Sequence, residues 1–365
     1  MKSIHIMILL VLLAGMIIPS GCTDPSGLSQ KETHLVTDML GREIHVPKQV
    51  DQVVGLRAGA LRLLVYMGAS GCIGGIEDLE RRPGRPYAMA HPELLEQPVI
   101  GPTMGGDAEL ITAASPDVIF ITYSTRSDAD ELQSRTSIPV VALNCGNFTD
   151  KRDTLYQSLR LIGKILHKEE RADSLISFFN HQIHLLDSLS GSYPESSRPG
   201  VYVGAISYSG ARGLVSTEPF YAPFQLVNAN NVASRLDNQL ISPVTGAAID
   251  IEQLIQWDPE YIFLDAAGLE ILKGESSLLS HLENTMTAAR KNQVFTLLPF
   301  NWYATNFETI LVNAWFIGKT IYPDAFHTVD PTEQARIIYQ FVLGHDVLDQ
   351  MCELYGCFSQ TSLGL

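Results

Sequence analysis

The sequence predicts an α/β protein of two lobes, each built on a parallel sheet with helices on both faces, joined by one long helix. Three observations support this prediction. Short apolar segments alternate with segments of helical periodicity, which is the pattern of strands buried in a parallel sheet. A proline-free stretch, 149–189, separates two regions that show this alternation. A short motif also occurs once in each region, at a constant offset of 143 residues.

The chain begins with the features of an export signal. Lys2 is the only charged residue before Asp24, and 4–18 is almost wholly apolar, which is short for a membrane span of about 20 residues. Small residues then precede Cys22. This order resembles a bacterial lipoprotein signal, which implies that Cys22 carries a lipid and becomes the new N-terminus. The alternative is an ordinary cleaved signal with a chance cysteine.

The order of segments predicts five parts of the chain. We expect a signal peptide over 1–21, a flexible tether over 22–33, an N-terminal α/β lobe over 34–167, a linking helix over 168–190 and a C-terminal α/β lobe over 191–365.

In the N-terminal lobe, a hairpin is expected over 38–47, because a glycine turn separates segments in which apolar and polar residues alternate. A helix is expected over 58–68, where apolar residues have helical spacing and a glycine ends the run. Strands of this lobe are expected at 50–56, 72–76, 118–122 and 140–143, and strands of the C-terminal lobe at 201–206, 261–264 and 294–297.

The stretch 149–189 predicts two consecutive helices. Leu155, Leu159 and Ile162 begin one apolar stripe, and Leu175 and Phe179 belong to a second. The second helix has about 20 residues and is therefore about 30 Å long. A helix of this length does not bend sharply without a break, so we expect little closure between the lobes.

Composition and cysteine usage exclude several classes of function. A net charge of −15 argues against nucleic-acid binding, which requires a basic surface. The ten histidines form no HxH or HxxxH pair with a nearby carboxylate, so we expect no bare-metal site. Nucleophile-elbow, P-loop, dinucleotide-binding and zinc-protease motifs are absent, so we expect no enzyme and no cofactor. Cys352 and Cys357 are close enough to pair, whereas Cys72 and Cys145 can be buried free thiols.

The repeated motif places one glutamate in each lobe. Asp107-Ala108-Glu109-Leu110-Ile111 precedes Pro116 and a buried strand, and Asp250-Ile251-Glu252-Gln253-Leu254 precedes Pro259 and another. In each copy we expect an aspartate N-cap, a short helix and a proline after it. The helix dipole alone favours an acid in the first turn, by about 0.3–1 kcal/mol. Two equivalent carboxylates, one per lobe, can also dock on the arginines of a two-fold symmetric partner.

These residues carry a family resemblance. The segment 37–47, TDMLGREIHVP, resembles the opening signature of periplasmic binding proteins for iron complexes and cobalamin, and 113–120, AASPDVIF, resembles their lobe motif. The resemblance extends from about residue 37 to about residue 356. It implies two Rossmann-like lobes, a rigid linking helix and a ligand cleft between the lobes. It also implies that Glu109 and Glu252 contact arginines of a permease.

The resemblance implies the function and the partners. The expected protein is a monomeric, lipid-anchored binding protein on the outer side of the membrane, periplasmic or at the cell surface. It captures an iron complex, a ferric siderophore or haem, and delivers it to an ABC permease dimer with its ATPase subunits. Cobalamin, molybdate or tungstate are alternative ligands within the same role. A surface receptor or sensor that meets no permease is the alternative from another class.

Candidate ligand residues follow from strand order, because ligands of open α/β sheets bind beyond the carboxyl ends of the strands. The loops after these strands are rich in arginine, which suits anionic groups, and in aromatics, which suit a macrocycle or an organic chelate. The residues singled out are Arg57, Arg82, Tyr87 and Arg126 in the N-terminal lobe, and Tyr208, Arg212, Trp302 and Tyr303 in the C-terminal lobe.

Overall fold

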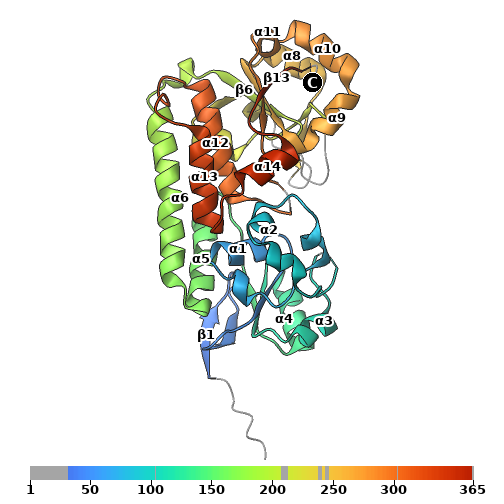
Figure 1. Ribbon diagram of the computed structural model, residues 1–365, viewed down its shortest axis with the longest axis vertical. Helices are drawn as coiled ribbons and strands as arrows, with labels where there is room; N and C mark the ends of the chain where they lie inside the picture. Colours follow the sequence, from blue (N-terminus) through green and yellow to red (C-terminus); the bar gives the residue numbers. More distant parts are fainter. Residues whose placement is uncertain are drawn as a thin grey trace, which may run out of the picture.

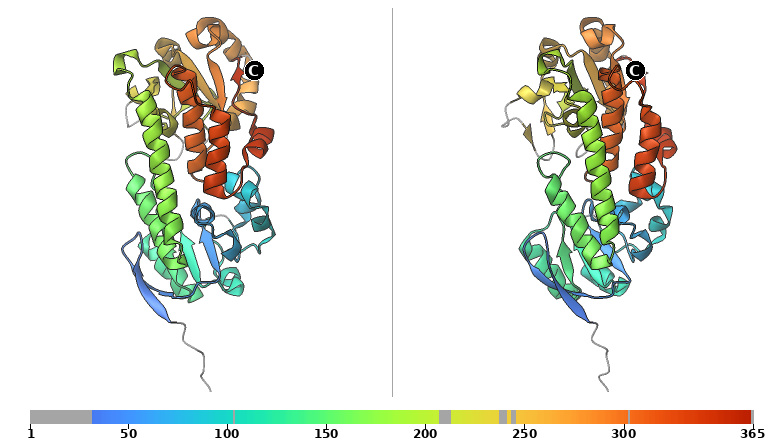
Figure 2. Two further views of the ribbon diagram at one scale, coloured as in Figure 1. Left: turned by 60° about the vertical axis from the view of Figure 1, so that its left-hand side comes forward. Right: turned by 90° about the vertical axis from the view of Figure 1, so that its left-hand side faces the viewer.

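The computed structural model describes residues 32–102, 104–206, 213–236, 241–242, 246–301 and 303–363. Two α/β lobes are stacked along the long axis, the N-terminal lobe in blue and teal and the C-terminal lobe mainly in yellow and orange (Figure 1). A layer of helices runs along one side of both lobes, as the turned views also show (Figure 2). The predicted fold class is confirmed.

A three-stranded parallel sheet forms the centre of the N-terminal lobe, in the order β3-β4-β5. Every residue of these strands is buried, because helices and loops cover both faces. The strands are β3 (Val53–Leu56), β4 (Val118–Ile121) and β5 (Val140–Ala142), preceded by the hairpin β1 (Thr33–Thr37) and β2 (Glu43–Pro47). The hairpin, the helix after β3 and three of the four strands of this lobe are therefore confirmed.

The strand predicted at 72–76 does not form. Its place is taken by a 3₁₀ turn, η1 (Ser70–Cys72), and by single bridges from Ile73 to Val53 and from Ile76 to Val99. Gly74 and Gly75 lie between the bridges, where a Cβ atom would come within 2.3 Å of Gln52 and 2.4 Å of Ile100. Close packing of the backbone at two glycines replaces a continuous ladder.

Helices surround this sheet. The helical segments are α1 (Ala60–Tyr66), η2 (Asp78–Arg81), α2 (Pro86–Ala90), η3 (Pro92–Glu96), α3 (Ala108–Ala114), α4 (Arg126–Thr136) and α5 (Arg152–Leu166).

The sheet of the C-terminal lobe has the order β13-β12-β11-β6-β8, with β13 alone antiparallel. The strands are β6 (Gly200–Gly204), β8 (Asn230–Asn231), β11 (Tyr261–Asp265), β12 (Val294–Leu297) and β13 (Gln360–Thr361); a second small sheet holds β7 (Ser216–Thr217), β9 (Ile241–Ser242) and β10 (Gly246–Ala248). The three strands predicted for this lobe are confirmed as β6, β11 and β12. A disulfide joins Cys352 to Cys357 just before β13.

The helical segments of this lobe are mostly short. They are η4 (Glu195–Ser197), α7 (Ala222–Leu226), η5 (Val232–Arg235), α8 (Ile251–Trp257), η7 (Ala266–Gly268), α9 (Leu269–Gly274), α10 (Ser276–Thr285), α11 (Thr287–Arg290) and α14 (Leu348–Tyr355).

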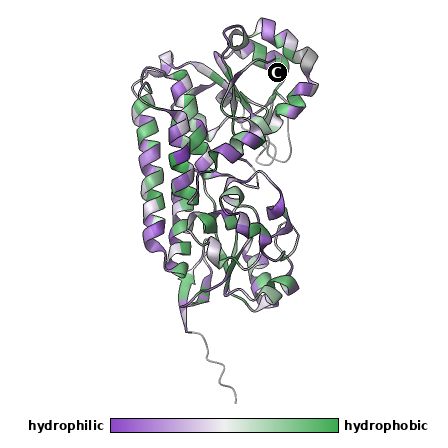
Figure 3. Ribbon diagram, in the orientation of Figure 1, coloured by the Kyte–Doolittle hydropathy of each residue, from purple (hydrophilic) through white to green (hydrophobic). Residues whose placement is uncertain are grey.

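The long helix α6 (Glu169–Ser190) crosses from one lobe to the other, but it is not alone. Two helices from the end of the chain, α12 (Phe307–Ile321) and α13 (Pro331–Leu343), pack with it in one layer, and α13 also contacts α1 and α2 of the N-terminal lobe. The helices of this layer are striped, with hydrophobic and hydrophilic residues alternating along their length (Figure 3). Three helices, rather than the single one predicted, therefore connect the lobes.

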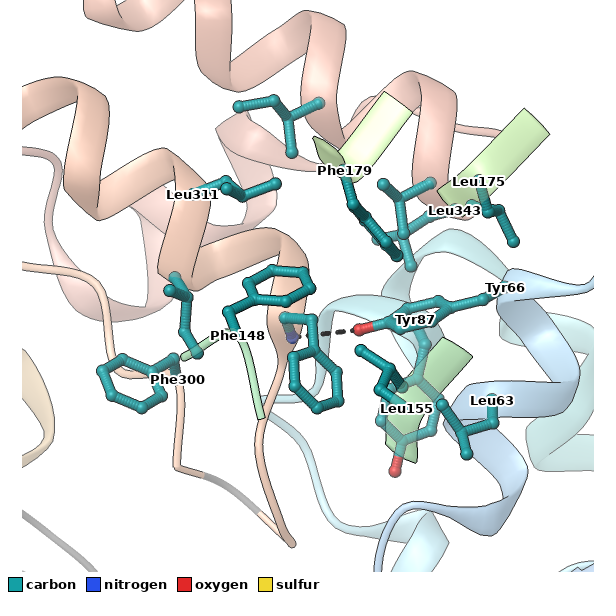
Figure 4. Packing of buried hydrophobic residues seen from close by; sticks show 14 of the residues in the cluster. Leu63, Tyr66, Tyr87, Phe148, Leu155, Leu175, Phe179, Phe300, Leu311 and Leu343 are labelled. Atoms are coloured by element: carbon teal, nitrogen blue, oxygen red, sulfur yellow. Dashed lines mark hydrogen bonds between the residues drawn. The ribbon is translucent and has the colours of Figure 1, made fainter. Parts of the chain in front are cut away.

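One hydrophobic core runs through this junction. The largest cluster of buried residues includes Val53 of β3, Leu175 of α6, Leu311 of α12 and Val203 of β6, so it is continuous across both lobes. Aromatic rings fill the junction (Figure 4). Phe148 lies 5.0 Å from Phe179 and 4.9 Å from Phe307, measured between ring centroids. Relative motion of the lobes would expose this shared core.

Candidate functional site in the cleft between the lobes

A cavity of about 750 Å³ lies between the two lobes and receives side chains from both. The N-terminal lobe contributes the segment between β5 and α5. The C-terminal lobe contributes the segment from β7 to α7 and the segment from the end of β12 to α12. The lining residues are Asn147, Thr149, Asp150, Glu218, Phe220, Ala222, Gln225, Phe300, Asn301, Thr305 and Ile310. The cavity combines amides, hydroxyls and carboxylates with two aromatic rings.

The loops beyond the strands carry unusual backbone conformations. Positive φ angles occur at Arg57 (65°) after β3, Tyr123 (46°) after β4 and Ala205 (60°) after β6. Tyr303 (51°) and Ala304 (64°), which follow β12, share this feature. Residues with side chains rarely adopt this conformation, and it persists only where surrounding contacts hold it. Positive φ angles also occur before strands, as at Ser115 and Asp258, so they are not confined to the carboxyl ends of the sheets.

Glu77 connects three segments of the cleft with one buried carboxylate. Its Oε1 accepts a hydrogen bond from the Gly105 N–H at 2.7 Å, and its Oε2 accepts one from the Arg57 N–H at 2.8 Å. The Tyr303 hydroxyl of the C-terminal lobe also donates to Oε2, at 2.7 Å. Burial raises the pKa of Tyr303, and the neighbouring Glu77 carboxylate raises it further. Glu77 thus accepts hydrogen bonds from both lobes.

Arg62 makes a second connection between the lobes. It belongs to α1, is 1% exposed, and lies over the Tyr87 ring at 5.0 Å. Its Nε donates to Asn306 Oδ1 at 2.8 Å, and its Nη2 donates to the carbonyls of Tyr303 and Ala304 at 2.6 Å and 3.2 Å. A buried guanidinium therefore holds the turn that follows β12.

Tyr66 and Glu308 form a third contact, at the start of α12. The Tyr66 hydroxyl donates to Glu308 Oε2 and accepts a hydrogen bond from the Phe307 N–H at 3.1 Å, the dashed line of Figure 4. Both side chains are fully buried, and burial raises the pKa of each. The first turn of α12 is thereby fixed to α1.

The predicted arginines of the N-terminal lobe do not line the cavity. Arg57 donates to the Tyr123 carbonyl at 2.6 Å and lies 3.3 Å from Asp128. Arg126 is exposed and donates to the carbonyls of Leu40 and Gly41 in the hairpin turn. Arg82 is exposed at the end of η2. Local partners therefore already bind two of the three guanidinium groups.

Tyr87 is a core residue rather than a surface residue of the cleft. It is 0% exposed, and its hydroxyl donates to Glu80 Oε2 at 2.6 Å. We predicted Tyr87 as a ligand residue because it lies in an arginine-rich loop beyond the carboxyl end of a predicted strand. The helix α2, which starts at Pro86, turns its side chain under Arg62. A ligand in the cavity has no exposed atom of Tyr87 to contact.

Tyr303 is partly buried in the cleft wall, next to the lining residues Asn301 and Thr305. The other predicted positions lie outside the described residues: Tyr208, Arg212, Trp302 and the anchor Cys22.

Sequence reasoning missed most of the cavity lining. Asn147, Thr149 and Asp150 follow β5, where the rule of carboxyl strand ends applies, but their short polar side chains resemble an ordinary turn. Phe220 and Gln225 follow β7, a strand of two residues that has no recognisable periodicity. Phe220 is 53% exposed, a large apolar side chain open to the cavity.

Glu109 and Glu252 occupy equivalent positions on the two lobes. Each is exposed in the first turn of a seven-residue helix, α3 or α8. Each helix ends at a residue of left-handed conformation, Ser115 or Asp258, before the proline and the strand. The Asp107 side chain caps α3 by accepting the N–H groups of Glu109 and Leu110. Asp250 occupies the N-cap position of α8, but its side chain makes no capping hydrogen bond.

The described ranges contain no group of three or more His, Cys, Asp or Glu that could hold a metal ion. None of the helices in the same ranges is long and apolar enough to cross a membrane. The thiols of Cys72 and Cys145 are free.

Comparison with known proteins gives consistent matches. The family model described as periplasmic binding protein matches residues 60–299. The molybdate-binding protein MolA of Haemophilus influenzae is 23% identical over 334 residues, which cover 84% of this chain and 90% of MolA.

Solved structures share the fold at low identity. The molybdate-bound MolA structure has a TM-score of 0.66 at 21% identity and covers 86% of this chain and 98% of MolA. A periplasmic solute-binding protein from Veillonella parvula has a TM-score of 0.70 at 18% identity, covering 89% and 97%. The petrobactin-binding protein YclQ of Bacillus subtilis has a TM-score of 0.57 at 17% identity, covering 81% and 99%.

Proposed function

The chain belongs to the periplasmic binding protein family, the class III solute-binding proteins of ABC importers, and from this premise we propose that it captures an iron complex, a ferric siderophore or haem, in the cavity between its lobes. Members of this family bind transported solutes outside the cytoplasm and are not enzymes. The observation that carries the choice of ligand is the size of the cavity. At about 750 Å³ it falls within the range of roughly 300–1,000 Å³ that organic ligands occupy.

The lining of the cavity supports a bulky organic ligand. Phe220, which is 53% exposed, offers an aromatic face to a chelate or a porphyrin, and Asn147, Gln225 and Asn301 offer amides that can both donate and accept hydrogen bonds. A tetrahedral oxyanion is much smaller than this cavity and would contact only part of its wall.

Molybdate is the second candidate, because one curated relative, 23% identical over 334 residues, is the molybdate-binding protein MolA. An oxyanion requires cationic or N–H donors, which the amides of Asn147, Gln225 and Asn301 in the cavity lining can supply in part. Tungstate and cobalamin remain alternatives within the same transport role.

A thermal-shift panel tests the choice of ligand. The purified protein is mixed with ferrichrome, ferric enterobactin, haem, cobalamin, molybdate and tungstate at equal concentrations. A ligand present at about 100 times its Kd stabilises the native state by about 2.7 kcal/mol, so binding appears as a rise of the melting temperature. We expect an iron complex to give the largest rise. A rise with molybdate and none with the iron complexes would contradict the choice of an iron complex and would identify molybdate as the ligand.

For delivery, we propose that Glu109 and Glu252 dock on arginines of the two permease subunits. Their equivalent positions and their exposure support this role, because a two-fold symmetric permease offers two equivalent surfaces. A receptor or sensor without a permease would not need this pair, so transport assays of glutamate variants separate the two classes.

We also propose that Cys22 anchors the protein to the membrane through a lipid. The apolar segment 4–18 followed by small residues and this cysteine supports lipoprotein processing. An anchor keeps the binding protein near its permease and raises the encounter rate. Cells grown with a labelled fatty acid should incorporate the label into the wild type and not into Cys22→Ala; a wild type without label would exclude the lipid.

A further inference from the structure

One wall of the cavity is a strained turn of the C-terminal lobe. Phe300, Asn301 and Thr305 line the cavity, and between them Tyr303 and Ala304 have φ angles of 51° and 64°. Residues with a Cβ atom rarely adopt this conformation unless neighbours hold it. The shape of the wall therefore depends on what stabilises the turn.

The contacts that hold the turn come from the other lobe. The fork of Arg62 donates to the carbonyls of both strained residues, at 2.6 Å and 3.2 Å, and to the Asn306 side chain at 2.8 Å. Asn306 in turn donates from Nδ2 to the Phe300 carbonyl at 3.1 Å, which closes the base of the turn. Arg62 is 1% exposed and does not line the cavity.

Glu77 holds the same turn from its other side. Its carboxylate accepts the Tyr303 hydroxyl at 2.7 Å while it also accepts the N–H groups of Arg57 and Gly105. Glu77 is 0% exposed. One buried acceptor therefore couples the turn of the C-terminal lobe to two loops of the N-terminal lobe.

We propose that Arg62 and Glu77 are positioning residues that hold the strained turn at Tyr303 and Ala304 and thereby set the shape of the ligand cavity without touching the ligand. The inference rests on the proposed function, because the wall affects binding only if the cavity holds the solute. In this view, two residues of the N-terminal lobe contribute to the affinity for the ligand because they shape a cavity wall that belongs to the C-terminal lobe.

Arg62→Lys tests whether Arg62 holds the turn at Tyr303 and Ala304. Lysine keeps the positive charge but lacks the planar fork that reaches the Tyr303 carbonyl, the Ala304 carbonyl and Asn306 together. In the free protein, we expect faster amide hydrogen exchange across 300–306. We also expect binding to weaken by about tenfold for whichever panel ligand raises the wild-type melting temperature most, the size of effect that loss of a charged hydrogen bond produces.

Arg171→Lys is the matched control. Arg171 also holds backbone carbonyls between helices, those of Tyr66, Phe341 and Val342, but it does not line the interlobe cavity. Its substitution should lower stability and leave both exchange across 300–306 and ligand affinity unchanged.

Rescue by glycine separates positioning from a general loss of stability. Glycine adopts a positive φ without the cost that a Cβ atom imposes. Ala304→Gly should therefore let the turn form without the hydrogen bonds from Arg62. In the Arg62→Lys background, Ala304→Gly should restore most of the lost affinity and slow the exchange across 300–306. A residue that only supports the fold would not be rescued by a change at the turn.

Three results would overturn the inference: unchanged exchange across 300–306 in Arg62→Lys, an equal loss of affinity in Arg171→Lys, or no rescue by Ala304→Gly. If Arg62→Lys does not fold, Tyr303→Phe replaces it, since it removes only the hydroxyl that donates to Glu77, and the same faster exchange is expected. If no panel ligand binds the wild type, the proposed function fails. Amide hydrogen exchange in the free protein still shows whether Arg62 and Glu77 hold the turn.

Discussion

Asp265 lies at the carboxyl end of β11, the central strand of the C-terminal sheet, and is 2% exposed. Burial raises the pKa of Asp265 from 3.8 to about 7; the Ala267 N–H, which donates to it at 2.9 Å, lowers the pKa, and Glu218 raises it. Glu218 lines the ligand cavity. The protonation of Asp265 therefore changes near neutral pH, at the edge of the cleft.

Asp265→Asn should remove a pH dependence of stability. Because the folded-state pKa is raised, the contribution of Asp265 to stability is fully present below pH 3.8 and is lost as the pH rises through about 7. The loss amounts to about 4 kcal/mol at most. We expect the wild type to lose free energy of unfolding between pH 5 and pH 8, and Asp265→Asn, which can still accept the Ala267 N–H, to lose much less.

Denaturant unfolding at the two pH values measures this difference, and Asp173→Asn, an exposed acid of α6, is the control. If the free energy of unfolding of Asp265→Asn depends on pH as strongly as that of the wild type, the pH dependence does not come from Asp265.

At the level of single residues, the sequence predicted where to look but not which side chains face the cavity. Of the loops singled out, the one after β12 lines the cavity between the lobes, whereas the loops after β3 and β4 contribute no lining residue. The partners of each side chain depend on segments distant in sequence: Arg126 binds the hairpin turn, and Tyr87 packs under Arg62. Periodicity and residue type contain no information on such contacts.

The helices α3 and α8 are the clearest case of one element used twice. Both have seven residues, an aspartate at the N-cap, a glutamate in the first turn and a proline two residues after the last helical residue. This local pattern made both helices and the strands after them predictable, because each signal lies within a few residues of the structure it specifies.

Substitution of Glu109 and Glu252 should separate transport from binding. If the proposed docking holds, each single change to alanine removes a charge-assisted contact and should reduce solute uptake by about tenfold, and the double variant should abolish uptake. Binding of the solute by the purified protein should not change, because both side chains lie outside the cavity.

Glu170→Ala is the control for this test, because Glu170 is also an exposed acid in the first turn of a helix, α6. It should leave uptake unchanged. Normal uptake by the double glutamate variant would exclude this docking role and favour a receptor that meets no permease.

The longer strands were predicted better than the strands of two residues. Continuous buried runs such as those of β4 and β11 stand out in the sequence, whereas β7, β8 and β13 have two residues each and carry no period. The segment 72–76 failed because Gly74 and Gly75 allow close packing in place of a ladder.

On the scale of the whole molecule, the lobes share one core and one layer of helices. The sequence predicted α6 as the link, since its stripe is long and uninterrupted. It did not predict that α12 and α13, about 120 residues later, would return to pack beside α6. Such packing depends on the fold of the complete chain. The buried hydrogen bond from Trp315 Nε1 to Gln182 Oε1, at 2.7 Å, is one contact that joins these helices.

This shared core predicts little closure on ligand binding. Rotation of the lobes would have to separate the rings of Phe148 and Phe307 and break the hydrogen bonds of Arg62 and Glu77. We expect X-ray scattering of the free and ligand-bound protein to give nearly the same radius of gyration. A large contraction on binding would show that the helical layer is a hinge.

If the solute binds between the lobes, a substitution that removes a lining residue of that cavity must weaken binding. Phe220→Ala removes an exposed aromatic face from the cavity of about 750 Å³. Ile337→Ala removes an exposed apolar side chain, 43% exposed, from a separate cavity of about 590 Å³ beside α13.

Calorimetric titration of both variants with the panel ligand that stabilises the wild type most tests this claim directly. We predict affinity about tenfold weaker for Phe220→Ala, since loss of a buried aromatic contact costs about 1–2 kcal/mol, and unchanged affinity for Ile337→Ala. Unchanged affinity in Phe220→Ala together with weaker binding in Ile337→Ala would place the solute outside the cleft and contradict the account.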